Sequence, residues 1–153
     1  CCDDLDYEMQ SSPHKMLVNG KHYKLDRKKV FYDTGVSLRY KDIFSFTGIE
    51  NDKNILLLGS YMEYDTKYML QNVQGLENVI FKNHPAVDIK RFGNISKNIT
   101  VSSESIYKLF ENAKIVIGTA SGTAVEAVSC GISVVIIASK DNLTANPLIG
   151  PVP

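Results

Sequence analysis

The chain has 153 residues, of which 44% are hydrophobic and 22% charged, and its 17 basic residues balance its 17 acidic ones. This composition is typical of a globular domain with one core. Zero net charge argues against nucleic-acid binding, which needs an excess of lysine and arginine. The three cysteines match neither a disulfide framework nor a metal site, and no apolar run approaches the roughly 18 residues of a transmembrane helix. We therefore expect a cytoplasmic protein, with the inner face of a membrane as an alternative location, and no metal.

Residues 1–50 show no regular alternation of strands and helices. The segment "MLVNGKHYKL" places apolar residues around an Asn-Gly pair, which predicts a hairpin with a type I′ turn. The segment "VFYDTGVSLRYKDIF" predicts an extended run that leads into a connector. The basic cluster at 21–29 is short and interrupted, as on a solvated face. We interpret residues 1–50 as the remnant of an N-terminal domain with its connector, and the chain as a piece of a longer protein.

Residues 51–153 alternate short apolar runs with segments of helical spacing. Short apolar runs of this kind predict buried strands, and their alternation with helices predicts a parallel sheet with right-handed crossovers. The expected fold class is therefore α/β, a Rossmann-like parallel sheet with helices on both faces. The strands are expected at 55–58, 79–81, 99–101, 114–117 and 134–137, and the helices at 64–73, 106–113 and 124–130, the last closed by Gly131.

Polar loops follow three of these strands and are expected to meet at the carboxyl edge of the sheet, where such folds bind ligands. They are Gly59-Ser60, residues 82–85 and residues 118–123, the last within the stretch "GTASGTAVEA". Backbone N–H groups at a helix N-terminus lack intrahelical partners, so the third loop can hold a phosphate. The fingerprint G-x-G-x-x-G is absent, which argues against a nicotinamide or flavin cofactor. The presence of Gly59 alone is explained by a strand-to-helix turn that needs a conformationally permissive residue.

His84 follows a buried strand and precedes Pro85, which restricts its backbone to extended conformations. A single histidine is usually a surface or core residue without further function. An imidazole held in this way can, however, donate a hydrogen bond to a phosphate oxygen, with Lys82 adding charge nearby. His84 is thus a candidate for stabilising a leaving phosphate.

Glu126 has two interpretations. In the first, Thr123 to Glu126 form a capping box, in which hydroxyl and carboxylate satisfy donors at the start of the helix. In the second, Glu126 accepts the two ribose hydroxyls of a nucleotide. Ser121 and Thr123 likewise either cap the helix or bind phosphate, and the two uses can alternate between free and bound states.

With these residues assembled, the chain resembles the C-terminal, nucleotide-sugar-binding half of a glycosyltransferase with two Rossmann domains (GT-B type). The matching segments are "VIFKNHP", "NAKIVIGTASGTAVEAVSCGISVVII" and "GVSLRYKDIF", and the resemblance covers about residues 35–150. It is greatest to bacterial sialyltransferases and to related capsule, lipopolysaccharide and teichoic-acid transferases that use cytidine-linked donors. This resemblance implies polysaccharide biosynthesis, with a nucleotide-sugar as donor substrate and no further cofactor.

Carried onto this chain, the resemblance makes His84 the group that stabilises the donor phosphate and Glu126 the ribose ligand. Retaining members of the wider class often have an earlier glutamate at the position that Gly118 occupies here, so an inverting mechanism is expected. Inversion needs a general base, which related enzymes supply from the N-terminal acceptor domain; nothing ties the acidic residues at 3, 4 and 6 to that role. The expected donor-binding residues are Gly59, Ser60, Lys82, His84, Thr119, Ser121, Gly122, Thr123 and Glu126.

Two alternatives stay open. A sugar-nucleotide 2-epimerase shares a glycine- and serine-rich turn followed by a glutamate, although it needs further acidic and histidine residues. The other alternative is a non-catalytic binding or interaction module that has the same sheet but no longer binds a nucleotide-sugar donor. Retention of Lys82, His84, Ser121 and Glu126 at one edge of the sheet argues against such a module.

Overall fold

The computed structural model describes residues 15–18, 31–34, 41–119 and 121–138, and contacts divide the chain into two compact units, 1–41 and 42–153. In the first unit, β1 (Lys15–Val18) pairs in parallel with β2 (Phe31–Thr34). The expected extended run is therefore confirmed for Phe31–Thr34, whereas its continuation at 35–40 lies outside the described residues. The Asn-Gly turn of the expected hairpin lies outside the described residues, as do the basic cluster at 21–29 and the acidic residues near the N-terminus.

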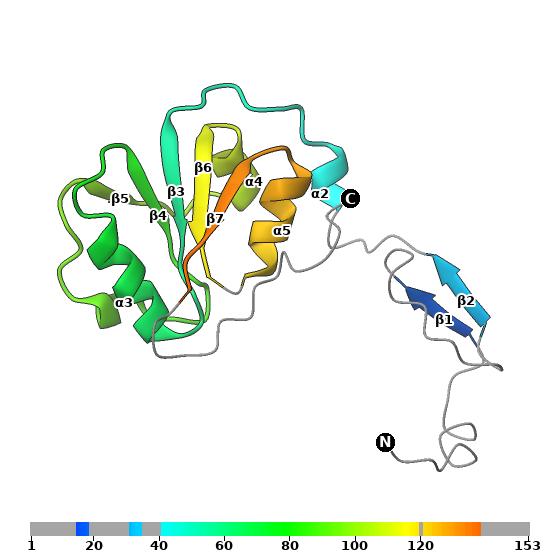
Figure 1. The fold of residues 1–153 in the computed structure, drawn as a ribbon, viewed down its shortest axis with the longest axis horizontal. Coiled ribbons are helices and arrows are strands. Elements are labelled where there is room, and N and C mark those ends of the chain that lie inside the picture. The colour runs from blue at the N-terminus through cyan, green and yellow to red at the C-terminus, as the bar shows by residue number, and fades with distance from the viewer. Residues whose placement is uncertain (1–14, 19–30, 35–40, 120, 139–153) are drawn as a thin grey trace, which may run out of the picture. The chain divides into compact units, whose positions relative to one another are not determined.

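The second unit contains a five-stranded, all-parallel sheet with the strand order β5-β4-β3-β6-β7 (Figure 1). This order corresponds to 3-2-1-4-5 along the chain, which is the Rossmann order. The five expected strands are confirmed, and the fold is the α/β, Rossmann-like fold expected from the alternation of elements. The strands are β3 (Asn54–Leu58), β4 (Val79–Lys82), β5 (Ile99–Val101), β6 (Ala113–Gly118) and β7 (Ser133–Ile136).

Helices cover both faces of the sheet because successive strand residues point to opposite sides. Leu57 belongs to the apolar cluster under α3 (Glu63–Asn72) and the 3₁₀ helix η3 (Ile89–Phe92), together with Met69, Phe81 and Phe92. Its neighbours Leu56 and Leu58 belong to a second cluster, under α4 (Ile106–Phe110) and α5 (Gly122–Ser129). A strand that is apolar on both sides is thus buried on both sides, as its continuous apolar run predicts.

The segment 42–50, assigned from the sequence to the N-terminal remnant, belongs by its contacts to the unit that holds the sheet. The short helix α2 (Lys41–Phe44) forms the start of this segment. Farther along it, Phe46 packs against the core beneath α4 and α5. The backbone N–H groups of Glu50 and Asn51 donate to the carbonyl of Glu111 at 2.7 and 3.2 Å. These contacts attach the connector to the sheet unit.

The central strands β3 and β6 are neighbours, but the chain leaves them in opposite directions. From β3 it continues through α3 to β4, and from β6 it continues through α5 to β7. Such a reversal of strand order leaves a crevice outside the carboxyl ends of the two strands, where α/β proteins bind ligands. The loops after β3 and β6 carry two of the three polar clusters singled out from the sequence.

Candidate functional site

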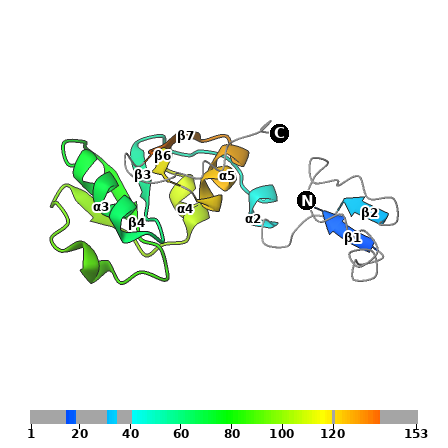
Figure 2. The ribbon, with the colours of Figure 1, turned by 60° about the horizontal axis from the view of Figure 1, so that its bottom comes forward.

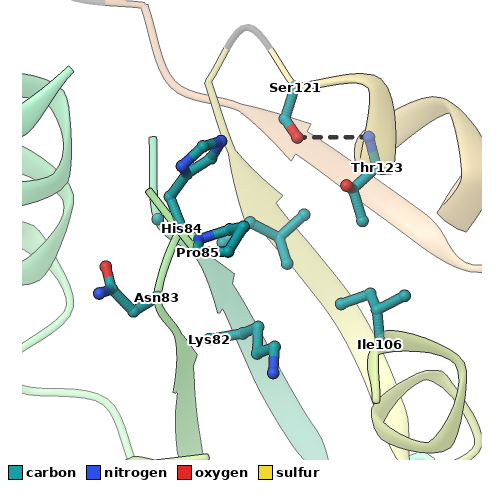
Figure 3. Close-up of a pocket in the computed structure, with 9 residues that line it drawn as sticks. Lys82, Asn83, His84, Pro85, Ile106, Ser121 and Thr123 are labelled. Atoms are coloured by element: carbon teal, nitrogen blue, oxygen red, sulfur yellow. Dashed lines mark hydrogen bonds between the residues drawn. The ribbon is translucent and has the colours of Figure 1, made fainter. Parts of the chain in front are cut away.

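A cavity of about 170 Å³ lies at the carboxyl ends of β3 and β4 and beside the start of α5 (Figure 3). All three expected loops contribute to it, so their convergence at this edge of the sheet is confirmed. The volume is below the roughly 300 Å³ at which pockets for whole small ligands begin, so the cavity fits one polar group of a larger ligand. Its lining residues are Leu58, Gly59, Lys82, Asn83, His84, Pro85, Ile106, Ser121 and Thr123.

Gly59 is required by a close approach of two backbones. A Cβ added at this position would lie 2.9 Å from the backbone nitrogen of His84 and 3.2 Å from the Cα of Asn83. The N–H of Gly59 also donates to the carbonyl of Lys82 at 2.8 Å. The permissive turn considered from the sequence is therefore not the reason for this glycine, because its φ angle is not positive. The absence of a side chain brings the loop after β3 against the loop after β4.

His84 is held by two contacts. The backbone N–H of Ala86 donates to its Nδ1 at 3.2 Å, and its ring packs edge-on against Tyr61 with centroids 5.7 Å apart. A neutral imidazole whose Nδ1 accepts carries its proton on Nε2, which can then donate to a ligand. Figure 3 shows the ring on the side of the cavity that faces Ser121. The expectation that this histidine is held in place is confirmed.

Lys82 lines the cavity, and one of its N–H donors is engaged within the protein. Its Nζ donates to the backbone carbonyl of Glu104 at 2.6 Å, in the segment that leads into α4. Figure 3 shows the side chain extending away from His84 and toward Ile106. The ammonium group therefore ties β4 to the start of α4. It can still contribute long-range positive charge and has further N–H donors.

The start of α5 differs from the expected capping box. Ser121 is the N-cap, and its Oγ accepts from the backbone N–H of Thr123 at 3.2 Å (Figure 3). Thr123 lies within the first turn, and the third helical position, where a capping box needs its glutamate, is Ala124. The capping-box interpretation of Thr123 and Glu126 is therefore wrong, whereas Ser121 does cap the helix. Ser121 and Thr123 both line the cavity.

Glu126 does not line the cavity. The residue is only 7% exposed, and its Oε2 accepts from the hydroxyl of Tyr107 on α4 at 2.9 Å. Burial, together with this hydrogen bond, raises the pKa of Tyr107, so the hydroxyl stays protonated as the donor. Burial and the nearby carboxylate also raise the pKa of the Cys130 thiol. The carboxylate thus has a partner inside the protein, and its role as a ribose ligand stays a prediction.

Three other residues expected in the site lie beside the cavity rather than in its lining. Ser60 Oγ accepts from the N–H of Met62 at 3.1 Å, which uses the hydroxyl within its own turn. Thr119 is buried, with 4% of its surface exposed, and within the described part of the chain its Oγ1 has no hydrogen-bond partner. Gly122 is exposed at the first turn of α5, and a Cβ there would meet nothing within 4 Å.

Four lining residues are not among the expected donor-binding residues, although two of them belong to the expected loop 82–85: Leu58, Asn83, Pro85 and Ile106. The amide of Asn83 points away from Ser121 and Thr123 in Figure 3, and its Nδ2 donates to the carbonyl of Val87 at 2.6 Å. Ile106 begins α4, which follows the carboxyl end of β5. The sequence could have indicated Ile106 because this residue follows the expected strand at 99–101, and every strand of a parallel sheet ends at the same edge.

Within the described ranges, no group of three or more His, Cys, Asp or Glu side chains is placed to hold a metal ion. The helices of those ranges include none that is long and apolar enough to cross a membrane. The polar side chains that line the cavity carry an imidazole, two hydroxyls, an amide and an ammonium group.

Comparison with known proteins adds no further constraint. No family model matches the chain, and neither the curated proteins nor the solved structures contain a match to it. The fold and the geometry of the cavity are accordingly the basis for the functional conclusion.

Proposed function

We propose that this chain is the donor-binding half of an inverting glycosyltransferase that takes a nucleotide-sugar, with cytidine-linked donors as the first candidates. The observation that carries the proposal is the arrangement at the switch point of the sheet. There His84 and the Ser121-capped start of α5 border one cavity from two different strands. An imidazole donor and a helix N-terminus on opposite sides of a small cavity suit a phosphate group.

Charge complementarity supports an anionic ligand at this place. The first turn of α5 contains no acidic residue, so the partial positive charge of the helix is not neutralised by the protein itself. The Lys82 ammonium group adds positive charge at the end of β4. The cavity accommodates one phosphate rather than a complete donor, so the sugar and the acceptor belong in a cleft shared with an N-terminal domain.

The chemistry proposed for the site is electrostatic. When the bond from the sugar to the donor phosphate breaks, negative charge grows on the phosphate. Donors that are already oriented toward it stabilise that charge without reorganisation. His84 Nε2 and the positive end of the α5 dipole would act in this way. The base that deprotonates the acceptor would come from the N-terminal domain, as the inverting reaction requires.

Nucleotide titration of the isotopically labelled chain tests the proposal. We expect CMP, CDP, UDP or GDP to shift amide signals of residues 82–84 and 118–126. Because this chain supplies only half of the proposed cleft, we expect a dissociation constant in the high micromolar to millimolar range, or roughly 4 to 6 kcal/mol of binding free energy. Cytidine without phosphate is the control and should shift these signals far less. Shifts confined to other residues, or no shift with any nucleotide, would contradict the proposed site.

A further inference from the structure

A buried hydrogen bond links the two helices that border one side of the cavity. The hydroxyl of Tyr107 on α4 donates to Oε2 of Glu126 on α5 at 2.9 Å, and Glu126 is 7% exposed. Both views of the fold show α4 and α5 side by side (Figures 1 and 2). A buried carboxylate is costly unless it is hydrogen-bonded, so this contact matters to both helices.

The bond lies immediately behind the wall of the cavity. Tyr107 follows Ile106, which lines the cavity, and Glu126 lies one helical turn after Thr123, which lines it as well. Figure 3 shows Ile106 and Thr123 next to one another on their two helices. Any change in the distance between α4 and α5 would therefore change the spacing of these two side chains.

Helix α4 depends on contacts of this kind for its position. It has only five residues, too few for a helix to be stable by itself. At its start, Lys82 Nζ donates to the carbonyl of Glu104 at 2.6 Å. The ring of Tyr107 packs edge-on against Phe110 with centroids 5.7 Å apart, and its hydroxyl reaches Glu126 on α5. The Tyr107–Glu126 bond is the polar contact that joins this short helix to α5.

We infer that Tyr107 and Glu126 are positioning residues of the nucleotide site, and that Glu126 acts on a bound nucleotide through the placement of α5 rather than by touching its ribose. The inference rests on the proposed function. In this role the carboxylate keeps Thr123 and the start of α5 against Ile106, so that the cavity retains its width. The assignment replaces the capping-box role and makes a ribose contact unnecessary.

The experiment measures the affinity of the chain for CDP and 2′-deoxy-CDP in the wild type, Tyr107→Phe, Glu126→Ala, Glu126→Gln and the double variant Tyr107→Phe/Glu126→Ala. We expect Tyr107→Phe and Glu126→Ala each to weaken binding on the order of tenfold, equally for both nucleotides. The double variant should be no weaker than either single variant, because both remove the same bond. Glu126→Gln should bind nearly as the wild type does, since an amide oxygen still accepts from Tyr107. Tyr68→Phe, which removes a hydroxyl from α3, is the matched control and should leave the affinity unchanged.

Two results of the affinity measurements would overturn the inference. One is a loss in Glu126→Gln that is larger for CDP than for 2′-deoxy-CDP, which would make the carboxylate a ribose ligand. The other is additive losses in the double variant. If Glu126→Ala fails to fold, the other two variants still test the inference, because it predicts weaker nucleotide binding for Tyr107→Phe and nearly unchanged binding for Glu126→Gln.

A nucleotide-free measurement separates this inference from the proposed function. In spectra without nucleotide, Tyr107→Phe should move the amide signals of both Ile106 and Thr123, whereas Glu126→Gln should leave them in place. If the wild type binds no nucleotide but these shifts occur, the proposed function is wrong and the tie between the helices stands. If the two signals do not move in Tyr107→Phe, the positioning role is wrong whatever the affinities are.

Discussion

The turns after β3 and β6 leave the same edge of the sheet, on the two sides of the switch point, and each runs from a glycine through a serine into a helix. They use their polar groups differently. In the turn after β3, Thr66 Oγ1 accepts from the N–H of Ser60 at 2.9 Å and donates to its carbonyl at 3.3 Å. In the turn after β6, Ser121 Oγ caps α5 and borders the cavity.

The two helices also differ in the acidic residues of their first turns. The first turn of α3 carries Glu63 and Asp65, whose carboxylates complement the positive end of the helix. The first turn of α5 carries no acidic residue. The turn after β3 thus leads into a helix whose positive end is neutralised by carboxylates of the protein itself. The start of α5 is capped by the neutral hydroxyl of Ser121 and carries no carboxylate, so its positive end is the one suited to an external anion.

His84 lies between the two turns, with Tyr61 on one side and the Ser121 side of the cavity on the other. In the complete two-domain enzyme that the proposal requires, His84→Ala should lower turnover on the order of a hundredfold, or about 2.7 kcal/mol. Donor binding should weaken less, because the charge on the phosphate is greatest in the transition state. Steady-state kinetics beside thermal unfolding provide the measurement. A folded variant with normal turnover would contradict the role.

Gly59→Ala should disturb the turn after β3. The new Cβ would lie 2.9 Å from the backbone nitrogen of His84, and backbone atoms cannot rotate away as a side chain can. We expect a loss of about 1 to 3 kcal/mol in the free energy of unfolding, measured in urea. Gly118→Ala is the control at the other turn, where the nearest atoms lie 3.6 and 3.8 Å away in the Leu58 side chain. Equal losses in the two variants would show that the close approach at Gly59 is unimportant.

Thr66→Val should remove the hydrogen bonds that complete the turn after β3 while preserving the shape of the side chain. Thr66 is fully buried, so we expect a loss of about 1 to 2 kcal/mol in unfolding free energy with little change in nucleotide affinity. Thr123→Val is the counterpart on α5. It should cost less, because the bond to Ser121 is made by the backbone N–H, which valine retains. A Thr66→Val variant as stable as the wild type would contradict the stabilising role of these hydrogen bonds.

Gly122→Asp should place a carboxylate at the positive end of α5, as Glu63 and Asp65 do at the start of α3. A side chain at this exposed position meets nothing within 4 Å, and a carboxylate at the start of α5 should stabilise the chain by about 0.3 to 1 kcal/mol. The same charge should weaken CDP binding, and high salt should reduce both effects. Gly122→Asn, which lacks the charge, is the matched control. Unchanged CDP affinity in Gly122→Asp would argue against an anion at this helix end.

Glu63→Gln should produce the smallest effect, at the start of α3. The hydrogen bond and charge of Lys67, at 2.6 Å, lower the pKa of the exposed Glu63 carboxyl, with a further contribution from Arg91. Since the folded-state pKa is depressed, the stabilisation is present at neutral pH and is lost as the pH falls through that pKa. The stability difference between wild type and variant should therefore be small at pH 7 and vanish in acid or in high salt. Urea unfolding at pH 7 and pH 3 measures it.

The alternation of strands and helices was determined by the sequence alone, because short apolar runs and helical spacing are local patterns. The same patterns placed Gly59, Lys82, His84, Ser121 and Thr123 at one edge, since the strands of a parallel sheet all end there. Gly131, which ends α5 with a φ of 80°, was likewise predictable from its residue type.

The contacts of the polar side chains depend on the tertiary packing. The hydroxyl of Ser121, not that of Thr123, caps α5, because the helix begins at Gly122. Glu126 faces Tyr107 and Lys82 reaches the carbonyl of Glu104, since α4 packs beside α5 and follows the strand next to β4. These partners are 19 and 22 residues away along the chain, so no local pattern could assign them.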